Sequence, residues 1–345
     1  MENYYYFFLL FLTIINFILF KFNNHIANFF NIYDEPDGRR KIHDKAVPLT
    51  GGIFLFINIF FIYTYLFTTG IYQIDNFNTT LFKNFSSLFL FLVVAFIIFF
   101  FGLIDDKFQI SPNKKILLII ILLSILIHFD NSLLLKVINI SYLQKFDIGI
   151  FSYFWTILCF LLLINAINMF DGFNLQSGMY FLFFLFFLIS KGFVNHLILG
   201  LVIFLIFFLY NNYNNKLFFG DGGTYLFAFI LGYISIKLYN TEIITYADEV
   251  VLVMIIPGLD LIRLFFFRLL KKKHPFSPDR EHLHHYLIES LQEKKALILI
   301  HSFIFVPIIL SNFLGFYLEI IIFQIFCYIL LVYIFKPKHK SNYNN

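Results

Sequence analysis

Charged residues are scarce in this sequence. They make up 13% of the 345 residues, against about 25% in a typical soluble domain. Hydrophobic residues make up 60%, and the mean hydropathy is +0.82. The two cysteines, Cys159 and Cys327, both fall in apolar runs and suggest neither a disulfide framework nor a cysteine metal site. The composition therefore predicts a protein whose main solvent is lipid, with no nucleic-acid partner.

The N-terminal segment, Met1–Phe20, has no basic start and no small-residue cleavage site, so we expect it to remain as a first helix. A helix needs about 20 mostly apolar residues to cross a bilayer. The chain offers eleven candidates, or ten if two closely joined runs form one span. We predict an all-α, polytopic integral membrane protein with one domain over residues 1–345. The expected spans are 3–22, 52–70, 86–104, 115–130, 150–167, 176–190, 195–211, 223–240, 249–268, 296–316 and 317–335.

The placement of lysine and arginine predicts the orientation. With alternating spans, one set of loops holds 19 of the 25 basic residues, and the other side with its helix ends holds 5. The basic side should be cytosolic, which puts the N-terminus outside and the C-terminus in the cytosol. The basic loops are 21–51, 105–115, 168–176, 211–222, 268–295 and 336–345.

Two of these loops combine charge with turn residues. In the first, Lys45 precedes Pro48 and Gly51-Gly52, a turn that would expose backbone N–H groups to a phosphate at a helix start. The basic run 39–41 is equally well explained as a topology signal facing anionic lipid. In the second, Asp105-Asp106 ends a helix, where two carboxylates are costly unless a cation or substrate uses them. A solvated helix end is the alternative.

Two further loops offer oxygen ligands. Asn165, Asn168 and Asp171 are spaced three residues apart, which places them on adjacent turns of one helical face. Asp221 lies in a glycine turn that opens a helix. Carboxylate and amide oxygens suit Mg²⁺.

The fifth loop carries three histidines. Ser277 and Pro278 are predicted as the N-cap and first residue of an interfacial helix. Its polar face should turn to the site and its leucine face to the membrane; a zinc site is the competing interpretation. The polar face comprises His282, His285 and Glu289, and the leucine face comprises Leu283, Leu287 and Leu291.

Taken in order, these segments resemble the polyprenyl-phosphate N-acetylhexosamine-1-phosphate transferases. Within them, PDREHLHH resembles the bacterial undecaprenyl-phosphate GlcNAc-1-phosphate branch more than the phospho-MurNAc-pentapeptide branch, which stays as an alternative. Where the bacterial pattern continues DGLDGLASG, this chain has DGFNLQSG (171–178), so Asn174 replaces the second aspartate and one residue is missing. The segments that carry the resemblance are RRKIHDKAVPLTGG, GLIDDKF, NAINMFDG, FFGDGG and PFSPDREHLHH.

The resemblance implies transfer of N-acetylhexosamine 1-phosphate from a UDP-sugar to undecaprenyl phosphate, with release of UMP, at the start of cell-envelope polysaccharide or O-antigen synthesis. It implies a multi-pass enzyme of the cytoplasmic (inner) membrane, surrounded by lipid, with its catalytic loops (about 34–51, 105–114, 168–176, 211–223 and 269–295) in the cytosol. It also implies Mg²⁺, with Mn²⁺ as the alternative, and we expect a homodimer. The implied residues are Asp105, Asp106 and Asp221 in catalysis; Asn168 and Asp221 at the metal; and Lys45, Asn165, Asp171, Asn174, Arg280, His282, His284 and His285 at the substrates.

The chemistry favours a single displacement. A phosphate monoester has a second pKa near 6, so the lipid phosphate is mostly a dianion at pH 7 and needs no strong base. Positioning and charge stabilisation are then the main tasks. A covalent intermediate on Asp105 or Asp106 is the alternative mechanism. A different class of function, a transporter of an anionic solute, would use Asp260 and Arg263 near the bilayer midplane.

Overall fold

The computed structural model describes residues 2–36, 45–70, 81–82, 84–277 and 279–337. The chain forms two compact units, residues 1–247 and 248–345, which are described separately. The single domain expected from the sequence stays a prediction.

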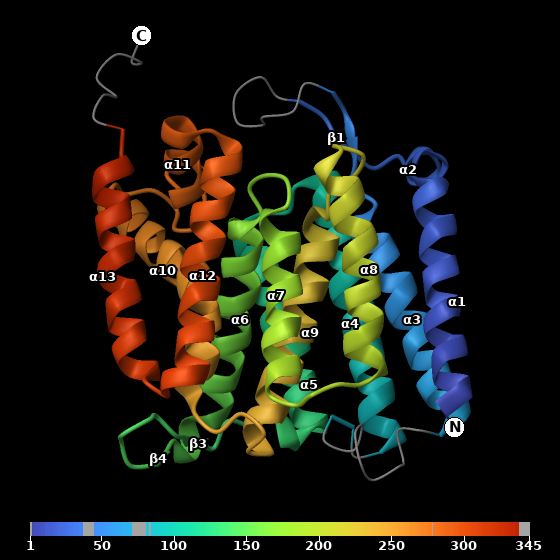
Figure 1. Cartoon of the computed structure of the whole chain (residues 1–345), viewed down its shortest axis with the longest axis horizontal. Coiled ribbons are helices and arrows are strands. Elements are labelled where there is room, and N and C mark those ends of the chain that lie inside the picture. The colour runs from blue at the N-terminus through green and yellow to red at the C-terminus, as the bar shows by residue number, and fades with distance from the viewer. Residues whose placement is uncertain (1, 37–44, 71–80, 83, 278, 338–345) are drawn as a thin grey trace. The chain divides into compact units, whose positions relative to one another are not determined.

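The first unit is a bundle of long helices with two small hairpins (Figure 1). In one hairpin β1 pairs antiparallel with β2, and in the other β3 pairs with β4. In chain order its helices and strands are α1 (Glu2–Lys21), α2 (Asn23–Phe30), β1 (Tyr33–Asp34), β2 (Val47–Pro48), α3 (Gly51–Thr69), α4 (Phe85–Phe108), α5 (Pro112–Phe129), β3 (Val137–Ile138), β4 (Phe146–Asp147), α6 (Ser152–Phe170), α7 (Gln176–Ser190), α8 (His196–Tyr213) and α9 (Gly220–Asn240), with single 3-10 turns at Asn131–Leu133 and Gly149–Phe151.

The second unit contains three long helices and one short one. The short helix α11 packs against α12 and α13 at one end of this unit. Its helices are α10 (Ala247–Leu270, which begins at the last residue of the first unit), α11 (Leu283–Leu291), α12 (Glu293–Leu314) and α13 (Tyr317–Phe335).

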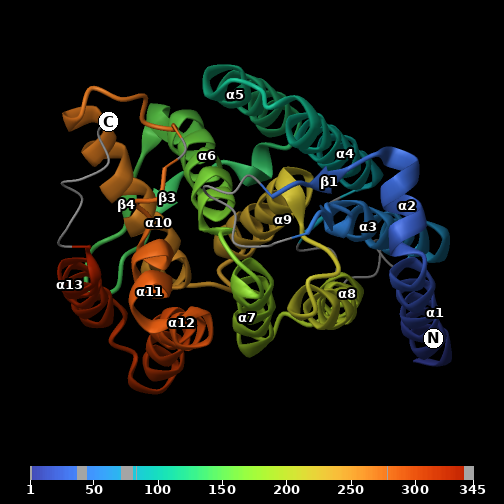
Figure 2. The same cartoon turned by 90° about the horizontal axis from the view of Figure 1, so that it is seen from above.

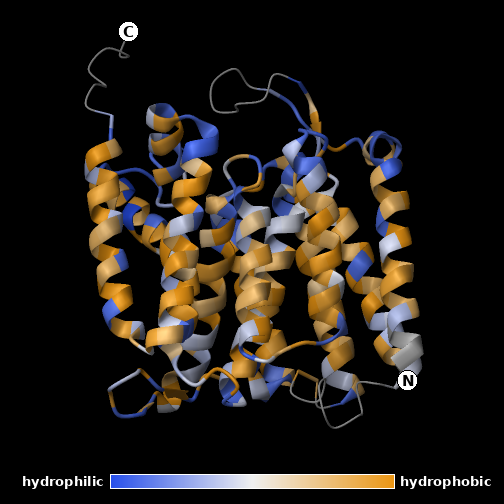
Figure 3. Ribbon diagram, viewed as in Figure 1, coloured by the Kyte–Doolittle hydropathy of each residue, from blue (hydrophilic) through white to orange (hydrophobic). Residues whose placement is uncertain are grey.

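The all-α, polytopic prediction is confirmed. All eleven predicted spans are helical, and nine helices among the described residues are long and apolar enough to cross a membrane. Residues Tyr6–Lys21 of α1 reach that criterion only together with α2, which is bent from them by 64°, and α7 has only 15 residues. The count of eleven and the orientation stay predictions. Figure 3 shows the apolar residues along the helices and hydrophilic residues at their ends.

Local sequence explains several helix boundaries. Asn84 caps α4, because its side chain accepts from the Ser87 N–H at 2.9 Å and the Ser87 hydroxyl faces the Asn84 N–H. Pro112 stands in the first turn of α5, where its missing N–H has no cost. α3 ends at Gly70, whose φ of +65° is a conformation that glycine adopts readily.

Helix α9 occupies the centre of the first unit (Figure 2). It packs against α3, α4, α6 and α7, and nearly all of its residues are buried. It is also the least apolar of the nine spans. A membrane helix surrounded by protein can carry small and polar residues that lipid would penalise, which is why α9 can begin with Gly-Asp-Gly-Gly.

The loops of the first unit gather at its two ends. At one end, residues 31–36 and 45–50, the α4–α5 turn, the α6–α7 loop and the α8–α9 loop lie near one another (Figure 1). At the other end, the Asn139 amide donates to the Thr245 carbonyl, which joins the hairpin β3–β4 to the loop after α9. The described parts of the four loops of this unit that the sequence assigned to one side therefore lie at one end.

A buried amide pair joins α1 to α3. Asn16 donates to Asn58 at 2.7 Å and Asn58 donates back at 2.9 Å, and both side chains are fully buried. Each amide satisfies polar groups that would otherwise be unpaired within the bilayer.

We predict that Asn16→Leu or Asn58→Leu alone lowers the free energy of unfolding by about 1–2 kcal/mol, because the remaining amide loses its partner. The double variant should lose less than the sum of the two. A double-mutant cycle by unfolding in mixed micelles measures this, and strictly additive losses would show that the pair does not couple.

Candidate functional site

The N-terminus of α9 touches α3 and α4 backbone to backbone. A Cβ atom built on Gly102 would lie 2.4 Å from the Gly222 Cα, and one on Gly52 would lie 2.5 Å from the Gly223 nitrogen. No side chain larger than hydrogen fits at these crossings. The glycines in GLIDD, LTGG and GDGG therefore let three helices converge at one point.

Asp106 caps α9 from a different helix. Its carboxylate accepts the N–H groups of Asp221 at 2.7 Å and Gly222 at 3.3 Å, two of the donors that a helix N-terminus leaves unsatisfied. Gly220 lies against it with φ +68°, and a Cβ there would be 2.6 Å from the Asp106 Oδ2. The structure thus gives Asp106 a positioning contact to Asp221.

Asp105 is also fully engaged. It accepts the Ile110 N–H at 2.9 Å and the Tyr225 hydroxyl at 3.1 Å, and it forms an ion pair with Lys115. Its side chain is buried. These bonds fix the turn between α4 and α5 and direct Lys115 toward the start of α9.

Asp221 is the more open carboxylate. Its side chain is 30% exposed; Oδ1 accepts from the Asn168 amide at 2.7 Å, and Oδ2 lies 3.7 Å from the Lys115 ammonium. Asn168 also donates to the Thr224 hydroxyl at 3.2 Å. The structure thus places Asn168 next to Asp221, the two residues that the resemblance implied at the metal. It adds Lys115, whose only signal in the sequence was its place in the first turn of the helix after Asp105-Asp106.

The predicted phosphate-binding turn before α3 is wrong. The N–H groups of Gly51 and Gly52 donate to the carbonyls of Phe218 and Phe219, both at 3.0 Å, so they hold the loop before α9 instead of a phosphate. Lys45 is exposed in the loop that precedes β2. The basic run 39–41 lies outside the described residues.

The α6–α7 loop holds Asp171 and Asn174. Burial raises the pKa of Asp171 to about 6, although the hydrogen bond from Ser177 opposes the shift. Asn174 donates to the Asn215 side chain at 2.5 Å, and the Leu175 N–H donates to Asn212 at 2.6 Å. The residue that departs from the family pattern therefore ties this loop to the α8–α9 loop.

Asn165 lies one turn before Asn168 on α6, and its amide donates to the Leu161 carbonyl of its own helix. It thus lies on the helix that carries Asn168, as the spacing predicted.

In the second unit, α11 begins later than predicted. Leu283 is its first residue and His282 its N-cap, so the prediction of Ser277 and Pro278 as the helix start is wrong; residue 278 itself lies outside the described residues. The prediction that the leucine face touches the membrane is wrong as well. Leu283 and Leu287 are buried in a helix that packs against α12 and α13, not against lipid.

The three histidine rings lie close together, with His282 stacked on His284 and His285 tilted against both. The ring centroids of His284 and His285 are 4.2 Å apart, and those of His282 and His284 are 5.2 Å apart. Burial lowers the pKa of His284 well below its usual value, and burial with the neighbouring His282 and Arg280 lowers the pKa of His285 to about 4. Both rings are therefore neutral at pH 7. Arg280 is exposed just before them.

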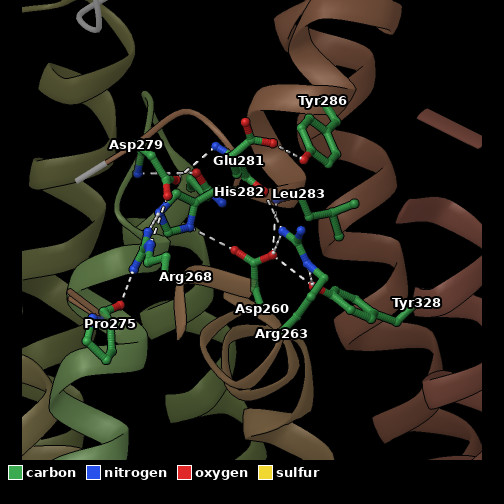
Figure 4. Close-up of polar contacts among 12 residues, drawn as sticks. Asp260, Arg263, Arg268, Pro275, Asp279, Glu281, His282, Leu283, Tyr286 and Tyr328 are labelled. Atoms are coloured by element: carbon green, nitrogen blue, oxygen red, sulfur yellow. Dashed lines mark hydrogen bonds and ion pairs between the residues drawn. The ribbon is translucent and has the colours of Figure 1, made fainter. Parts of the chain in front are cut away.

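Asp260 and Arg263 pair with each other at 2.8 Å. Asp260 also accepts from the Tyr328 hydroxyl and His282, so this pair belongs to a hydrogen-bonded cluster within the second unit (Figure 4). The one feature that favoured a transporter is thus explained by structural pairing.

The donor set around Asp221 fits a hard divalent cation. Among the described residues, no group of three or more His, Cys, Asp and Glu side chains is arranged to hold a metal ion. Mg²⁺ commonly takes one or two protein oxygens and completes its shell with water and substrate phosphates. Asp221 with the Asn168 amide supplies such a set, and the Lys115 ammonium lies 3.7 Å from Asp221.

Residues 88–239, which run from α4 to α9, match the sequence profile of glycosyl transferase family 4. This segment contains every carboxylate described at the start of α9. The predicted resemblance is thereby confirmed.

Comparisons with individual proteins agree with this match. The chain is 28% identical over 284 residues to the probable undecaprenyl-phosphate N-acetylglucosaminyl 1-phosphate transferase of Bacillus subtilis, which covers 79% of this chain and 75% of the relative. It is 26% identical over 331 residues to the undecaprenyl-phosphate α-N-acetylglucosaminyl 1-phosphate transferase of Thermotoga maritima. This match covers 96% of this chain and 98% of the relative. The enzyme of the same name from Escherichia coli K12 is 26% identical over 301 residues, with 81% and 75% covered.

We predict that Gly102→Ala lowers the free energy of unfolding by about 1–3 kcal/mol, because its methyl group meets the Gly222 backbone and the helices must separate. Gly258→Ala is the matched control, since nothing lies within 4 Å of a Cβ at this helical glycine. It should be neutral or stabilising by up to about 1 kcal/mol. Equal effects of the two substitutions would contradict the close crossing.

Proposed function

We propose that the chain transfers N-acetylhexosamine 1-phosphate, most simply GlcNAc 1-phosphate, from a UDP-sugar to undecaprenyl phosphate. The observation that carries this proposal is the meeting of Asp221, Asn168 and Lys115 at the start of α9, inside the segment that matches glycosyl transferase family 4. The names of the bacterial relatives supply the substrate class. Such a transfer would begin the synthesis of a cell-envelope polysaccharide.

The reaction is a phosphoryl transfer. An oxygen of the lipid phosphate attacks the β-phosphorus of the UDP-sugar, the bond from that phosphorus to the bridging oxygen breaks, and UMP leaves. Two negatively charged groups must meet beside a medium of low dielectric constant, so the enzyme must mainly supply positive charge and alignment. Lys115 is the described cation at this point, held there by Asp105.

The contacts of Asp105 and Asp106 favour a single displacement. Asp106 accepts two backbone N–H groups, and Asp105 accepts a backbone N–H, a hydroxyl and an ammonium. A carboxylate with its lone pairs so engaged is a poor nucleophile, whereas the lipid phosphate is already ionised at pH 7. We therefore assign both aspartates to positioning Asp221 and Lys115 instead of to covalent catalysis.

Asp221 and Asn168 would hold Mg²⁺, or Mn²⁺ as the alternative. When bound, the metal would neutralise charge on the diphosphate. Lys45, Asn165, Asp171 and Asn174 stay our predicted substrate contacts in the first unit. Arg280, His284 and His285 stay predicted substrate contacts of the second unit, and His282 is reassigned below.

We also propose the orientation. The loop end that carries Asp221 faces the cytosol, where UDP-sugars are found, with the N-terminus outside and the C-terminus inside. The described parts of the basic loops support it, since they lie at this end of the first unit. The location in the cytoplasmic membrane and the homodimer belong to the same proposal.

We expect purified protein to release UMP from UDP-GlcNAc only when both undecaprenyl phosphate and Mg²⁺ are present. Asp221→Asn should reduce turnover by at least about 100-fold, because a neutral amide replaces the metal-facing carboxylate. Asp147→Asn, an exposed aspartate at the opposite end of the first unit, is the control and should keep wild-type turnover. Full turnover in EDTA would refute the metal site, and a burst of UMP without lipid would indicate a covalent intermediate.

The pKa of Asp171 predicts a pH effect on donor binding. If the ionised carboxylate binds the donor, the dissociation constant for UDP-GlcNAc should rise up to about tenfold per pH unit below about 6, and Asp171→Asn should remove this step. Calorimetry without lipid avoids the acceptor phosphate, which titrates near the same pH.

Stability gives an independent check on Asp171. Burial favours its protonated form, so its contribution to stability is present below about pH 4 and is lost as pH rises through about 6. Asp171→Asn should therefore raise the melting temperature more at pH 8 than at pH 4. An equal change at both pH values would show that the carboxyl is not perturbed.

Thiol labelling tests the orientation. In a background with Cys159→Ser and Cys327→Ser, Lys45→Cys should react with a membrane-impermeant reagent only after intact cells are permeabilised. Lys145→Cys lies exposed at the other end of the first unit and should react from outside. The reverse pattern would invert the topology.

A further inference from the structure

Helix α10 holds the histidine segment (residues 275–277 and 279–285) through two arginines. Arg268 donates to the Asp279 carboxylate at 2.8 Å and to the Pro275 carbonyl at 2.7 Å. Arg263 donates to the Glu281 carbonyl at 2.5 Å. Figure 4 shows both guanidinium groups directed at this segment. The path of the segment before α11 is therefore set by side chains of α10.

Asp260 holds the point at which the histidine segment becomes α11. Its Oδ2 lies 2.8 Å from the His282 Nδ1, and its Oδ1 accepts the Leu283 N–H at 3.1 Å. The same Oδ1 accepts from Arg263 and from the Tyr328 hydroxyl of α13, each at 2.8 Å. Asp260 is only 6% exposed. Its carboxylate is therefore surrounded by protein and contacted by these four hydrogen-bond donors.

The chemistry of these partners fixes the state of His282. An ionised carboxylate only accepts hydrogen bonds, so Nδ1 of His282 carries a proton. The other ring nitrogen, Nε2, faces the Arg268 guanidinium at 3.5 Å, and a guanidinium only donates. The His282 side chain is 8% exposed. Both of its nitrogens are therefore directed at protein groups within this unit.

We propose that Asp260 is a positioning residue that fixes the start of α11 through His282 and the Leu283 N–H, and that His282 serves this bond instead of binding substrate. The effect on turnover rests on the proposed function, in which His285 and Arg280 contact the substrates. Because His285 lies in the first turn of α11 and its N–H donates to the His282 carbonyl, a shift of His282 moves that turn.

Four isosteric or near-isosteric variants test this role. In Asp260→Asn, an NH₂ group replaces one of the two carboxylate oxygens. If it takes the place of Oδ2 it faces the His282 N–H, and if it takes the place of Oδ1 it faces the Leu283 N–H, so one of these two bonds is lost in either orientation. His282→Asn places an amide nitrogen near the position of Nδ1 and can keep the bond to Asp260. His282→Gln places it near Nε2 and cannot. Tyr328→Phe removes a partner of Asp260 on α13 but neither bond to the start of α11.

The first measurement is hydrogen exchange of the Leu283, His285 and Tyr286 amides in wild type and in all four variants. We expect exchange to rise roughly tenfold or more in Asp260→Asn and His282→Gln, and to change little in His282→Asn and Tyr328→Phe. This readout does not depend on activity. Unchanged exchange in Asp260→Asn would overturn the proposal, and if that variant does not fold, the comparison of His282→Asn with His282→Gln decides.

The second measurement is turnover of UDP-GlcNAc with undecaprenyl phosphate. We expect His282→Asn to keep most of the wild-type kcat/KM for the donor and His282→Gln to lose about tenfold or more. If His282→Asn is as inactive as His282→Gln while its α11 amides stay protected, His282 acts on the substrate and the proposal is wrong. If wild type itself does not turn over these substrates, the proposed function fails, while the exchange measurement still decides the role of Asp260.

Discussion

Close approach of three backbones is the constraint on which the rest of the first unit depends. Gly222 and Gly223 of α9 touch Gly102 of α4 and Gly52 of α3 with no room for a methyl group. Since helix association in lipid relies on packing and hydrogen bonds instead of the hydrophobic effect, such contacts are an effective way to hold polar helix ends together. They bring Asp106 within reach of the α9 N-terminus. The charged side chains are thus arranged by residues that have no side chain.

The carboxylates described above differ in how many hydrogen bonds they accept from protein groups. Asp105, Asp106 and Asp260 each accept at least two bonds from protein groups. Asp221 accepts from the Asn168 amide at one oxygen, and its other oxygen lies 3.7 Å from the Lys115 ammonium, with Asp105 close by. Burying a charge is costly unless it is paired, so the engaged carboxylates stabilise a geometry. The partly exposed one is suited to a ligand. Ordered acidic motifs therefore need not act on the substrate directly.

Sequence reasoning predicted the helices well, because long apolar runs are a strong local signal. It also paired Asn168 with Asp221, which lie 53 residues apart, through the family pattern. It failed where the outcome depends on distant partners. The N–H groups of Gly51 and Gly52 are taken by the carbonyls of Phe218 and Phe219, which are far away in the sequence. The start of α11 depends on Asp260, 23 residues earlier. Neither partner can be read from local spacing.

The shortness of α7 has a consequence for the surrounding lipid. Its 15 residues span about 22 Å, whereas the 24 residues of α4 span about 36 Å. A bilayer has a hydrocarbon core of about 30 Å, so a span as short as α7 would favour local thinning of the bilayer beside it. The loop before α7 carries Asp171 and Asn174. Hydrophobic mismatch would thus draw the headgroup layer inward beside this loop, and with it the phosphate of any long-chain lipid that diffuses along that side.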